Sequence, residues 1–183
     1  MQMPPIPTDP SVRAVIDQQV QVMFRLADEA LADLTLDECL WQIDPRSWTV
    51  HRRDGRWFGE IGDEYPDLPT PSLAWTMWHP IWWLRTLLAH TKGEPAPAPE
   101  MVEWPGPDAA LSLLRELWAE WSEFVAALDA DELESSALTT FPYTDERPFV
   151  YVVGWASMEL TKNISEMCVL RGIHRDLACT MQG

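Results

Sequence analysis

Apolar residues recur at steps of three and four in four separate stretches of this 183-residue chain. Such spacing places them on one face of an α-helix, so we expect amphipathic helices at about residues 9–35, 71–91, 107–129 and 148–178. The third stretch has the most regular seam, formed by Ala110, Leu114, Leu117, Trp121, Phe124 and Leu128. Alternating steps of four and three are typical of helices in a bundle. The sequence therefore predicts an all-α protein, a four-helix bundle, in which residues 1–183 form one domain.

Proline marks the start of each expected helix, at Pro10, Pro71, Pro107 and Pro148. It suits the first helical turn because the N–H that proline lacks has no partner there. Before the first of these prolines, Thr8 or Asp9 supplies a capping oxygen. These residues predict where each helix begins.

The connection over residues 34–71 is long and lacks helical periodicity. Leu36 to Trp41 is expected to form one short turn of helix. Asp54-Gly55 favours the tight turn of a small β-hairpin between the two tryptophan-containing segments that flank it. A connection this long is usually functional or disordered, and its tryptophans favour a packed cover over the domain. The segments 91–107 and 129–147 are expected to be loops.

The second expected helix carries His79 in the middle of a tryptophan-rich face. At about 100° per residue, Trp75, Trp82 and Trp83 share that face with the imidazole. Pro80 removes one backbone hydrogen bond and disfavours the helical conformation at the histidine before it. Local rules are broken most often at functional sites, so His79 is a candidate functional residue. The three tryptophans are either core packing or the wall of a pocket for an apolar or aromatic ligand.

Two polar residues, Glu159 and Asn163, interrupt the apolar face of the fourth expected helix one turn apart. By the same geometry, Lys162 and Ser165 are expected to project to the opposite side. An unpaired buried polar group costs about 1–3 kcal/mol, so we expect partners for the inward pair. His79 is the obvious partner, and the three side chains are expected to converge in the interior. The alternative is a satisfied polar pair that only fixes the register of the helix.

Two stretches carry a resemblance to a known family, "PSLAWTMWHPIWWL" at residues 71–84 and "GWASMELTKNISEMCVLRGIHR" at residues 154–175. Together with the four long helices and the long first connection, they resemble the DinB-like superfamily, which includes DinB and mycothiol-dependent maleylpyruvate isomerase-like proteins. The resemblance implies an up-down-down-up four-helix bundle and frequent homodimers. It also implies, as in many members, a nickel or zinc ion held by three histidines. Relatives include thiol-dependent transferases and isomerases, so a small thiol cofactor is a further expectation.

The resemblance places the metal ligand of the second helix on His79. It places the HxxxH pair of the closing helix on Glu159 and Asn163, so the expected metal ligands are His79, Glu159 and Asn163. A glutamate can replace a histidine as a ligand, but a neutral amide oxygen is a poor ligand for zinc or nickel. The chain therefore departs from the family pattern, and its ligand set is degenerate.

Acidic residues outnumber basic ones by 29 to 13, which gives a formal net charge of −16. A surface this negative repels phosphate backbones and anionic lipids, so we expect neither nucleic acid nor membrane as a partner. Cys39, Cys168 and Cys179 lack metal or redox spacing, and no secretory signal opens the chain. Reduced thiols in the cytoplasm are therefore expected.

Three functions remain open from the sequence. The first is a metal-dependent enzyme, a thiol-dependent transferase or isomerase or a hydrolase, in which the ion activates a thiol or water. The second is a metal-free protein that binds a small ligand between the helices, oriented by the polar trio. The third is a structural homodimer with a vestigial site.

Overall fold

The computed structural model describes residue 4, residues 11–62 and residues 69–180. Within this part of the chain the fold is predominantly helical, as predicted, with six α-helices and a three-stranded antiparallel sheet. The long helices are α1 (Val12–Ala30), α3 (Leu73–Lys92), α4 (Pro107–Ala127) and α6 (Val150–Thr180). Two short helices, α2 (Leu36–Leu40) and α5 (Ala130–Glu134), lie in the connections. In the described residues, no helix combines the length and apolarity needed to cross a membrane.

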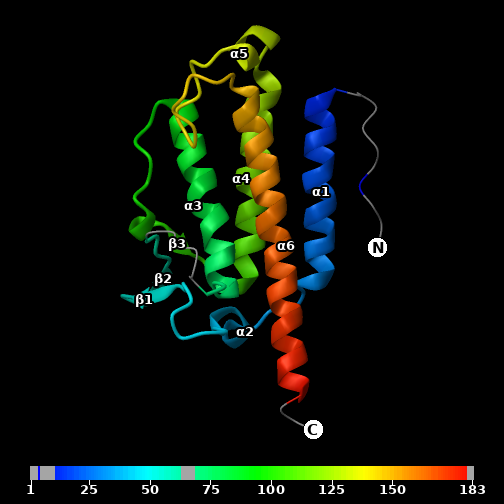
Figure 1. Ribbon diagram of the computed structural model, residues 1–183, viewed down its shortest axis with the longest axis vertical. Helices are drawn as coiled ribbons and strands as arrows, with labels where there is room; N and C mark the ends of the chain where they lie inside the picture. Colours follow the sequence, from blue (N-terminus) through cyan, green and yellow to red (C-terminus); the bar gives the residue numbers. More distant parts are fainter. Residues whose placement is uncertain (1–3, 5–10, 63–68, 181–183) are drawn as a thin grey trace.

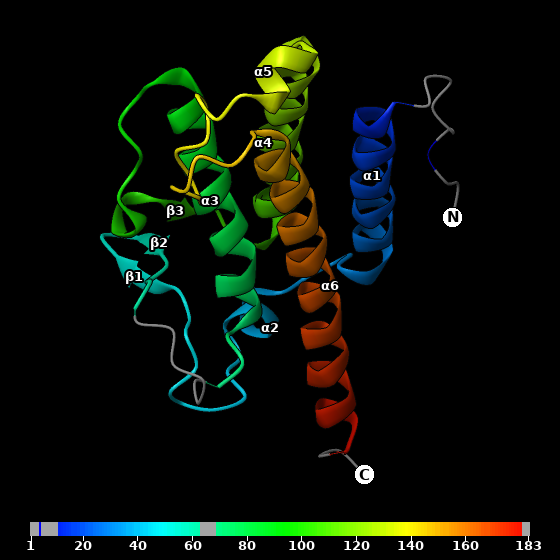
Figure 2. The same ribbon diagram turned by 45° about the horizontal axis from the view of Figure 1, so that its top comes forward.

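The four long helices lie alongside one another (Figure 1). Helix α6 packs against α1 and α3, and α3 packs in addition against α4. In Figure 1, α3 and α4 run upward whereas α1 and α6 run downward, so α3 and α6 are antiparallel neighbours. The C-terminal part of α6 extends beyond the other helices in both views (Figure 2). This pairing of α3 with α6 positions the candidate site.

The long helices begin close to the predicted prolines. Helix α4 begins at Pro107 itself, and α3 and α6 begin two residues after Pro71 and Pro148. The start of α3 is displaced because the side chain of Ser72 caps it, accepting a hydrogen bond from the backbone N–H of Trp75 at 3.2 Å. The predicted cap of the first helix, at Thr8, Asp9 and Pro10, lies outside the described residues.

The predicted hairpin is confirmed, and a third strand extends it. Strands β1 (His51–Arg53) and β2 (Arg56–Phe58) flank Asp54 and Gly55, whose φ angles of 49° and 81° suit a two-residue hairpin turn. Strand β3 (Glu103–Trp104) pairs antiparallel with β2, so the prediction of a simple loop over residues 91–107 was wrong. The buried Trp104 and its neighbour Val102 hold this segment against α3, because the carbonyl of Val102 accepts a 2.8 Å hydrogen bond from the indole of Trp78.

Both short helices begin with a capping box. The side chain of the capping residue accepts a hydrogen bond from the backbone N–H three residues later, and the side chain of that later residue accepts one from the backbone N–H of the capping residue. Helix α2 starts after Thr35, paired in this way with Glu38, and confirms the predicted short turn. Helix α5 starts after Asp129, paired with Glu132, within the segment 129–147 that was expected to be a loop. The expectation missed this helix because its capping pair, Asp129 and Glu132, has no apolar repeat behind it.

Helix α3 is the most buried element of the fold. It continues through Pro80 to Lys92, and most of its side chains lie in the core. A helix that is apolar on nearly every side is stabilised by packing from all directions, which offsets the missing hydrogen bond at a proline. Large indoles supply much of this packing, with Trp78, Trp83, Trp104, Trp118 and Trp121 almost fully buried.

Candidate functional site: the cavity between helices α3 and α6

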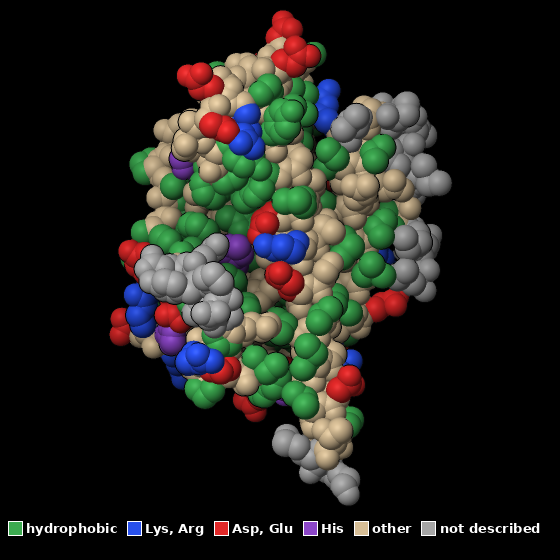
Figure 3. Space-filling view, viewed as in Figure 1, with side chains coloured by type: hydrophobic (Ala, Val, Ile, Leu, Met, Phe, Trp, Pro, Cys, Tyr) green, Lys and Arg blue, Asp and Glu red, His purple; other side chains and the backbone are tan. Residues whose placement is uncertain are grey.

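A cavity of about 720 Å³ lies between the N-terminal half of α3 and the middle of α6. Trp48, Trp75, His79, Lys162, Asn163 and Glu166 are among the residues that line it. We call it the α3–α6 cavity. Over the middle of α6, the space-filling view shows a basic side chain between acidic ones, next to a histidine (Figure 3). The antiparallel packing of the two helices therefore brings residues more than eighty positions apart in sequence, such as His79 and Lys162, to one cavity.

His79 lies in this wall with its ring held between aromatic side chains. It stacks on Trp75 with 4.8 Å between ring centroids and an interplanar angle of 12°, and on Trp82 at 6.0 Å. Its Nδ1 atom is buried and has no hydrogen-bond partner in the described part of the chain. Burial, and secondarily the positive charge of Lys162, lowers the pKa of His79 to about 4. The imidazole is therefore neutral at physiological pH.

Asn163 is only 1% exposed, and both the oxygen and the nitrogen of its side-chain amide form hydrogen bonds. The Oδ1 atom accepts a hydrogen bond from the Trp83 indole at 3.2 Å, and Nδ2 donates to a carboxylate oxygen of Glu166 at 3.2 Å. The oxygen that a metal ion would need is thus already used by an indole N–H. Asn163 fixes the register of α3 against α6 and holds Glu166 at the cavity.

Glu159 is buried at 9% exposure, as its place in the apolar face predicted. Its carboxylate pairs with the ammonium of Lys162, three residues along the helix, and no hydrogen bond joins it to His79 within the described residues. Lys162 and Ser165, predicted to project to the opposite side of the helix, are both exposed, and both also line the cavity. The long lysine stem curves back along the helix and brings its charged end to the buried carboxylate.

The three tryptophans expected to form a pocket wall separate in the structure. Trp75 lines the α3–α6 cavity together with Trp48, and the two rings contact each other with centroids 5.0 Å apart. Trp82 and Trp83 are not among the described lining residues. Trp82 packs on Phe141 instead, and Trp83 on Trp155 with centroids 5.0 Å apart. The sequence did not predict that Trp48 lines this cavity, because Trp48 belongs to the long connection and helical periodicity does not place it.

The donor set at this place does not fit the nickel or zinc ion that the family resemblance implies. Among the described residues, no group of three or more histidine, cysteine, aspartate or glutamate side chains is placed to hold a metal. Glu159 is already paired with an ammonium, and the amide oxygen of Asn163 is bonded to an indole. The positive charge of Lys162 beside His79 also repels a second cation. We derive no chemistry through a metal here.

Two of the three cysteines, Cys39 and Cys168, provide no activated thiol. Cys39 is buried, and desolvation raises the pKa of its thiol to about 12. Burial also raises the pKa of Cys168. A thiol with a raised pKa carries little thiolate, the reactive form, so these two side chains behave as small apolar groups.

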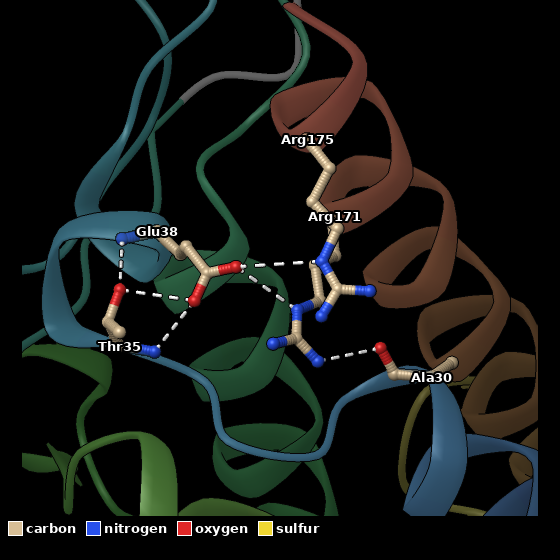
Figure 4. A network of polar contacts seen from close by, with 5 residues as sticks. All are labelled: Ala30, Thr35, Glu38, Arg171 and Arg175. Carbon is tan, nitrogen blue, oxygen red and sulfur yellow. Dashed lines mark hydrogen bonds and ion pairs between the residues drawn. The ribbon is translucent and has the colours of Figure 1, made fainter. Parts of the chain in front are cut away.

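A second polar cluster on α6 was not found from the sequence. Arg171 is 3% exposed and donates to Glu38 at 3.2 Å and to the carbonyl of Ala30 at 2.9 Å (Figure 4). Burial alone would raise the pKa of Glu38, but hydrogen bonds from Thr35 and Arg171 lower it. One signal was present: Arg171 lies eight residues after Asn163, so it continues the same inward face of the helix. This cluster ties α2 and the end of α1 to α6.

A search of curated proteins found no match to the chain. The family model described as the DinB superfamily matches residues 19–167. This range includes α2 with Glu38, α3 with His79, and α6 as far as Met167. The chain therefore belongs to the DinB superfamily, as the two motifs predicted.

Proposed function

We propose that this member of the DinB superfamily binds a small planar molecule in the α3–α6 cavity without the help of a metal ion. The observation that carries the proposal is the cavity wall itself, where the indoles of Trp48 and Trp75 adjoin the neutral ring of His79. A volume of about 720 Å³ is in the range of small-molecule sites. Such sites combine aromatic walls with a few polar groups, as here.

The polar atoms of His79 favour binding over a purely structural role. A core histidine usually gains hydrogen bonds that offset its burial, whereas the buried Nδ1 of His79 has none among the described residues. Leaving such a group unpaired costs about 1–3 kcal/mol. Local costs of this kind gather at functional sites, and His79 lines the α3–α6 cavity.

The arrangement of the long helices supports the same proposal. We infer that α1, α3, α4 and α6 form the up-down-down-up bundle that the family resemblance implies, with α3 and α6 as antiparallel neighbours. Ligand sites in bundles are built between facing helices from side chains that project inward. The α3–α6 cavity has that position.

Isothermal titration calorimetry with small aromatic compounds tests the proposal. Naphthalene derivatives should bind with Kd in the micromolar to millimolar range, and cyclohexane derivatives with the same polar group should bind more weakly because they cannot stack. Trp48→Leu should weaken binding about fivefold, since one aromatic contact is worth about 1 kcal/mol beyond its area. Trp57→Leu is the matched control, because Trp57 is also half-buried but packs on Trp104 in the sheet. Absence of binding by every aromatic probe would contradict the proposal.

Metal-assisted catalysis is the second candidate, favoured by one observation, the unpartnered Nδ1 of His79. It requires that the ion pair between Glu159 and Lys162 break and that Asn163 Oδ1 lose its hydrogen bond from the Trp83 indole. Elemental analysis of tag-free protein, produced with added nickel and zinc, separates the two candidates. Stoichiometric metal that is lost in His79→Ala would support catalysis and overturn metal-free binding.

A further inference from the structure

The charged groups at the α3–α6 cavity leave one negative charge uncompensated. The ammonium of Lys162 is ion-paired with the carboxylate of Glu159, and His79 is neutral. Glu166 lines the same cavity and is exposed, and its carboxylate has no ion-pair partner in the described part of the chain. The amide of Asn163 donates to one of its oxygens at 3.2 Å, but a neutral donor leaves the charge in place. The charge that remains at the cavity is therefore that of Glu166.

The hydrogen-bonding capacity left near Glu166 is that of an acceptor. The neutral donors of the surrounding wall are used within the protein, since Trp75, Thr76 and Ser165 each donate to a backbone carbonyl, at 2.7, 3.0 and 2.9 Å. The Oε2 atom of Glu166 accepts from Asn163, and its Oε1 atom has no hydrogen-bond partner among the described residues. A ligand that bonds to Oε1 must supply a donor, as an ammonium does.

The order of residues along the two antiparallel helices sets Glu166 against the indoles. His79 and Lys162 are near enough for the ammonium to lower the pKa of the imidazole. From this level, Trp75 lies four residues back along α3 and Glu166 four residues on along α6. In antiparallel helices both steps run in the same direction, about 6 Å at 1.5 Å per residue. Glu166 is therefore level with Trp75, whose ring contacts that of Trp48 with centroids 5.0 Å apart.

The surroundings of this carboxylate also favour a cation. The face of an indole carries the negative part of the ring quadrupole, so it attracts a cation that approaches it. The whole protein has a formal net charge of −16, which draws cations toward its surface and repels anions. The local charge at Glu166, the aromatic wall and the charge of the whole chain thus have the same sign of preference.

We infer that the ligand of the α3–α6 cavity is an arylalkylamine in its protonated form, whose ring lies on Trp48 and Trp75 and whose ammonium binds the carboxylate of Glu166. The inference rests on the proposed function, because it names the chemical class of the planar molecule. Charge-assisted hydrogen bonds of this kind are among the stronger polar contacts. Lys162 repels a cation placed beside His79, but the ammonium of the ligand lies one helical turn away from it.

Three probes of one ring system test this class by isothermal titration calorimetry on the full chain at pH 7. They are 2-naphthylmethylamine, which is protonated at this pH, the neutral 2-naphthylmethanol and the anion 2-naphthoate. We expect the amine to bind roughly tenfold more tightly than the alcohol, and the acid to bind most weakly. Glu166→Gln should lower the affinity for the amine to that for the alcohol. The glutamine keeps a side-chain oxygen that can accept from Asn163, so the wall is preserved.

Glu116→Gln is the matched control for Glu166→Gln. Glu116 is also an exposed glutamate of a long helix, α4, and its replacement removes the same charge from the protein. It does not line the α3–α6 cavity, so the preference for the amine should stay unchanged. An equal loss of preference in both variants would mean that only the charge of the whole protein attracts the amine, and would overturn the inference.

Lys162→Gln tests the charge balance from the other side. It removes the ammonium and leaves the carboxylate of Glu159 without its cationic partner, so the cavity becomes more negative. Binding of the amine should strengthen severalfold, and binding of the neutral alcohol should not change. Weaker binding of the amine by this variant would contradict the inference.

The remaining outcomes separate the inference from the proposed function. Equal affinity for amine and alcohol in the unmodified protein, or tightest binding by the acid, would overturn the inference and leave the proposed function standing. If Glu166→Gln weakened amine and alcohol alike, the glutamate would be a structural partner of Asn163 and the inference would fail. If no probe bound, both the inference and the proposed function would fall.

Discussion

Helix α6 contributes to two buried polar clusters, one around Arg171 and one that Asn163 forms together with His79 of α3. They differ in whether their polar atoms have hydrogen-bond partners. In the Arg171 cluster, the guanidinium donates to Glu38 and to the carbonyl of Ala30, and Glu38 also caps α2 (Figure 4). In the His79 cluster, eight residues earlier on α6, Asn163 is fully bonded while the imidazole Nδ1 is buried without a partner in the described chain. The second cluster lines a cavity of about 720 Å³.

The comparison separates two uses of a buried polar group. Where the hydrogen-bonding capacity is filled by the protein, the group fixes elements relative to one another. Where capacity remains beside a cavity, the group is available to a ligand, and the fold carries the cost until the ligand binds. The Arg171 cluster should therefore control stability, and the His79 cluster should control binding. Four measurements can break or sharpen this distinction.

The largest expected effect is on the Arg171 cluster. Arg171→Met should lower the free energy of unfolding by about 3–5 kcal/mol, because it leaves the largely buried carboxylate of Glu38 without its main partner. Urea denaturation followed by circular dichroism measures the change. Arg175→Gln is the control, since Arg175 is 57% exposed and 4.0 Å from the same carboxylate, and should cost less than about 0.5 kcal/mol. Equal costs for both variants would show that Arg171 does not hold the elements together.

The next effect concerns the pH dependence of stability. His79 has a pKa of about 4 in the folded protein, against about 6.5 when unfolded. Between these values the unfolded chain binds more protons, so stability falls as the pH falls from about 6.5 and the loss is complete near pH 4. The loss contributed by this one group is at most about 3 kcal/mol.

The variant His79→Phe should lack this part of the pH dependence. The free energy of unfolding of each protein is measured at pH 7.5 and at pH 4.5, and the two losses are compared. The contribution of carboxylates that titrate in both proteins cancels in this comparison. We expect the variant to lose less stability on acidification than the unmodified protein. Identical losses would mean that the imidazole is solvated in the folded state, and the contrast between the clusters would then disappear.

The outline of both clusters was accessible from the sequence to different degrees. Helical periodicity predicted that Glu159 and Asn163 are buried, and both are. The same periodicity placed Lys162 on the outer side, where it is exposed, but it did not predict the ion pair with Glu159 beside the cavity, because a Cα direction does not describe where a long flexible side chain ends. Arg171 continued the inward face and still went unnoticed, since its partner Glu38 lies in a short connecting helix that no periodic pattern relates to α6.

The fold shows the same division between local and non-local information. Caps, the Asp54-Gly55 turn and the apolar seams are local signals, and they predicted the long helices and the hairpin. Strand β3 depends on pairing with β2 from more than forty residues away, so a proline-rich segment gave no local sign of it. The Trp48 part of the cavity wall was hidden for the same reason.

A smaller effect is expected at Asn163, the bonded member of the His79 cluster. Asn163→Leu should lower the free energy of unfolding by about 1–3 kcal/mol, because the N–H of the buried Trp83 indole loses its acceptor. Ser165→Ala, on the exposed side of the same helix, is the control and should change it by less than about 0.5 kcal/mol. A neutral Asn163→Leu variant would indicate that water or another group readily replaces the amide.

The smallest effect on stability is expected at Lys162, a lining residue of the α3–α6 cavity. Its ammonium is half-exposed, so water screens the pair with Glu159, and the amide of Lys162→Gln can still donate to that carboxylate. The free energy of unfolding should therefore change by less than about 1 kcal/mol, as measured by the same urea titration used for Arg171→Met. Two basic residues on one helix, each paired with a glutamate, would then differ several-fold in their effect on stability. If Lys162→Gln instead cost as much as Arg171→Met, the lysine would be a structural partner of a buried carboxylate, as Arg171 is of Glu38, and the two clusters would not differ in what their basic residues do.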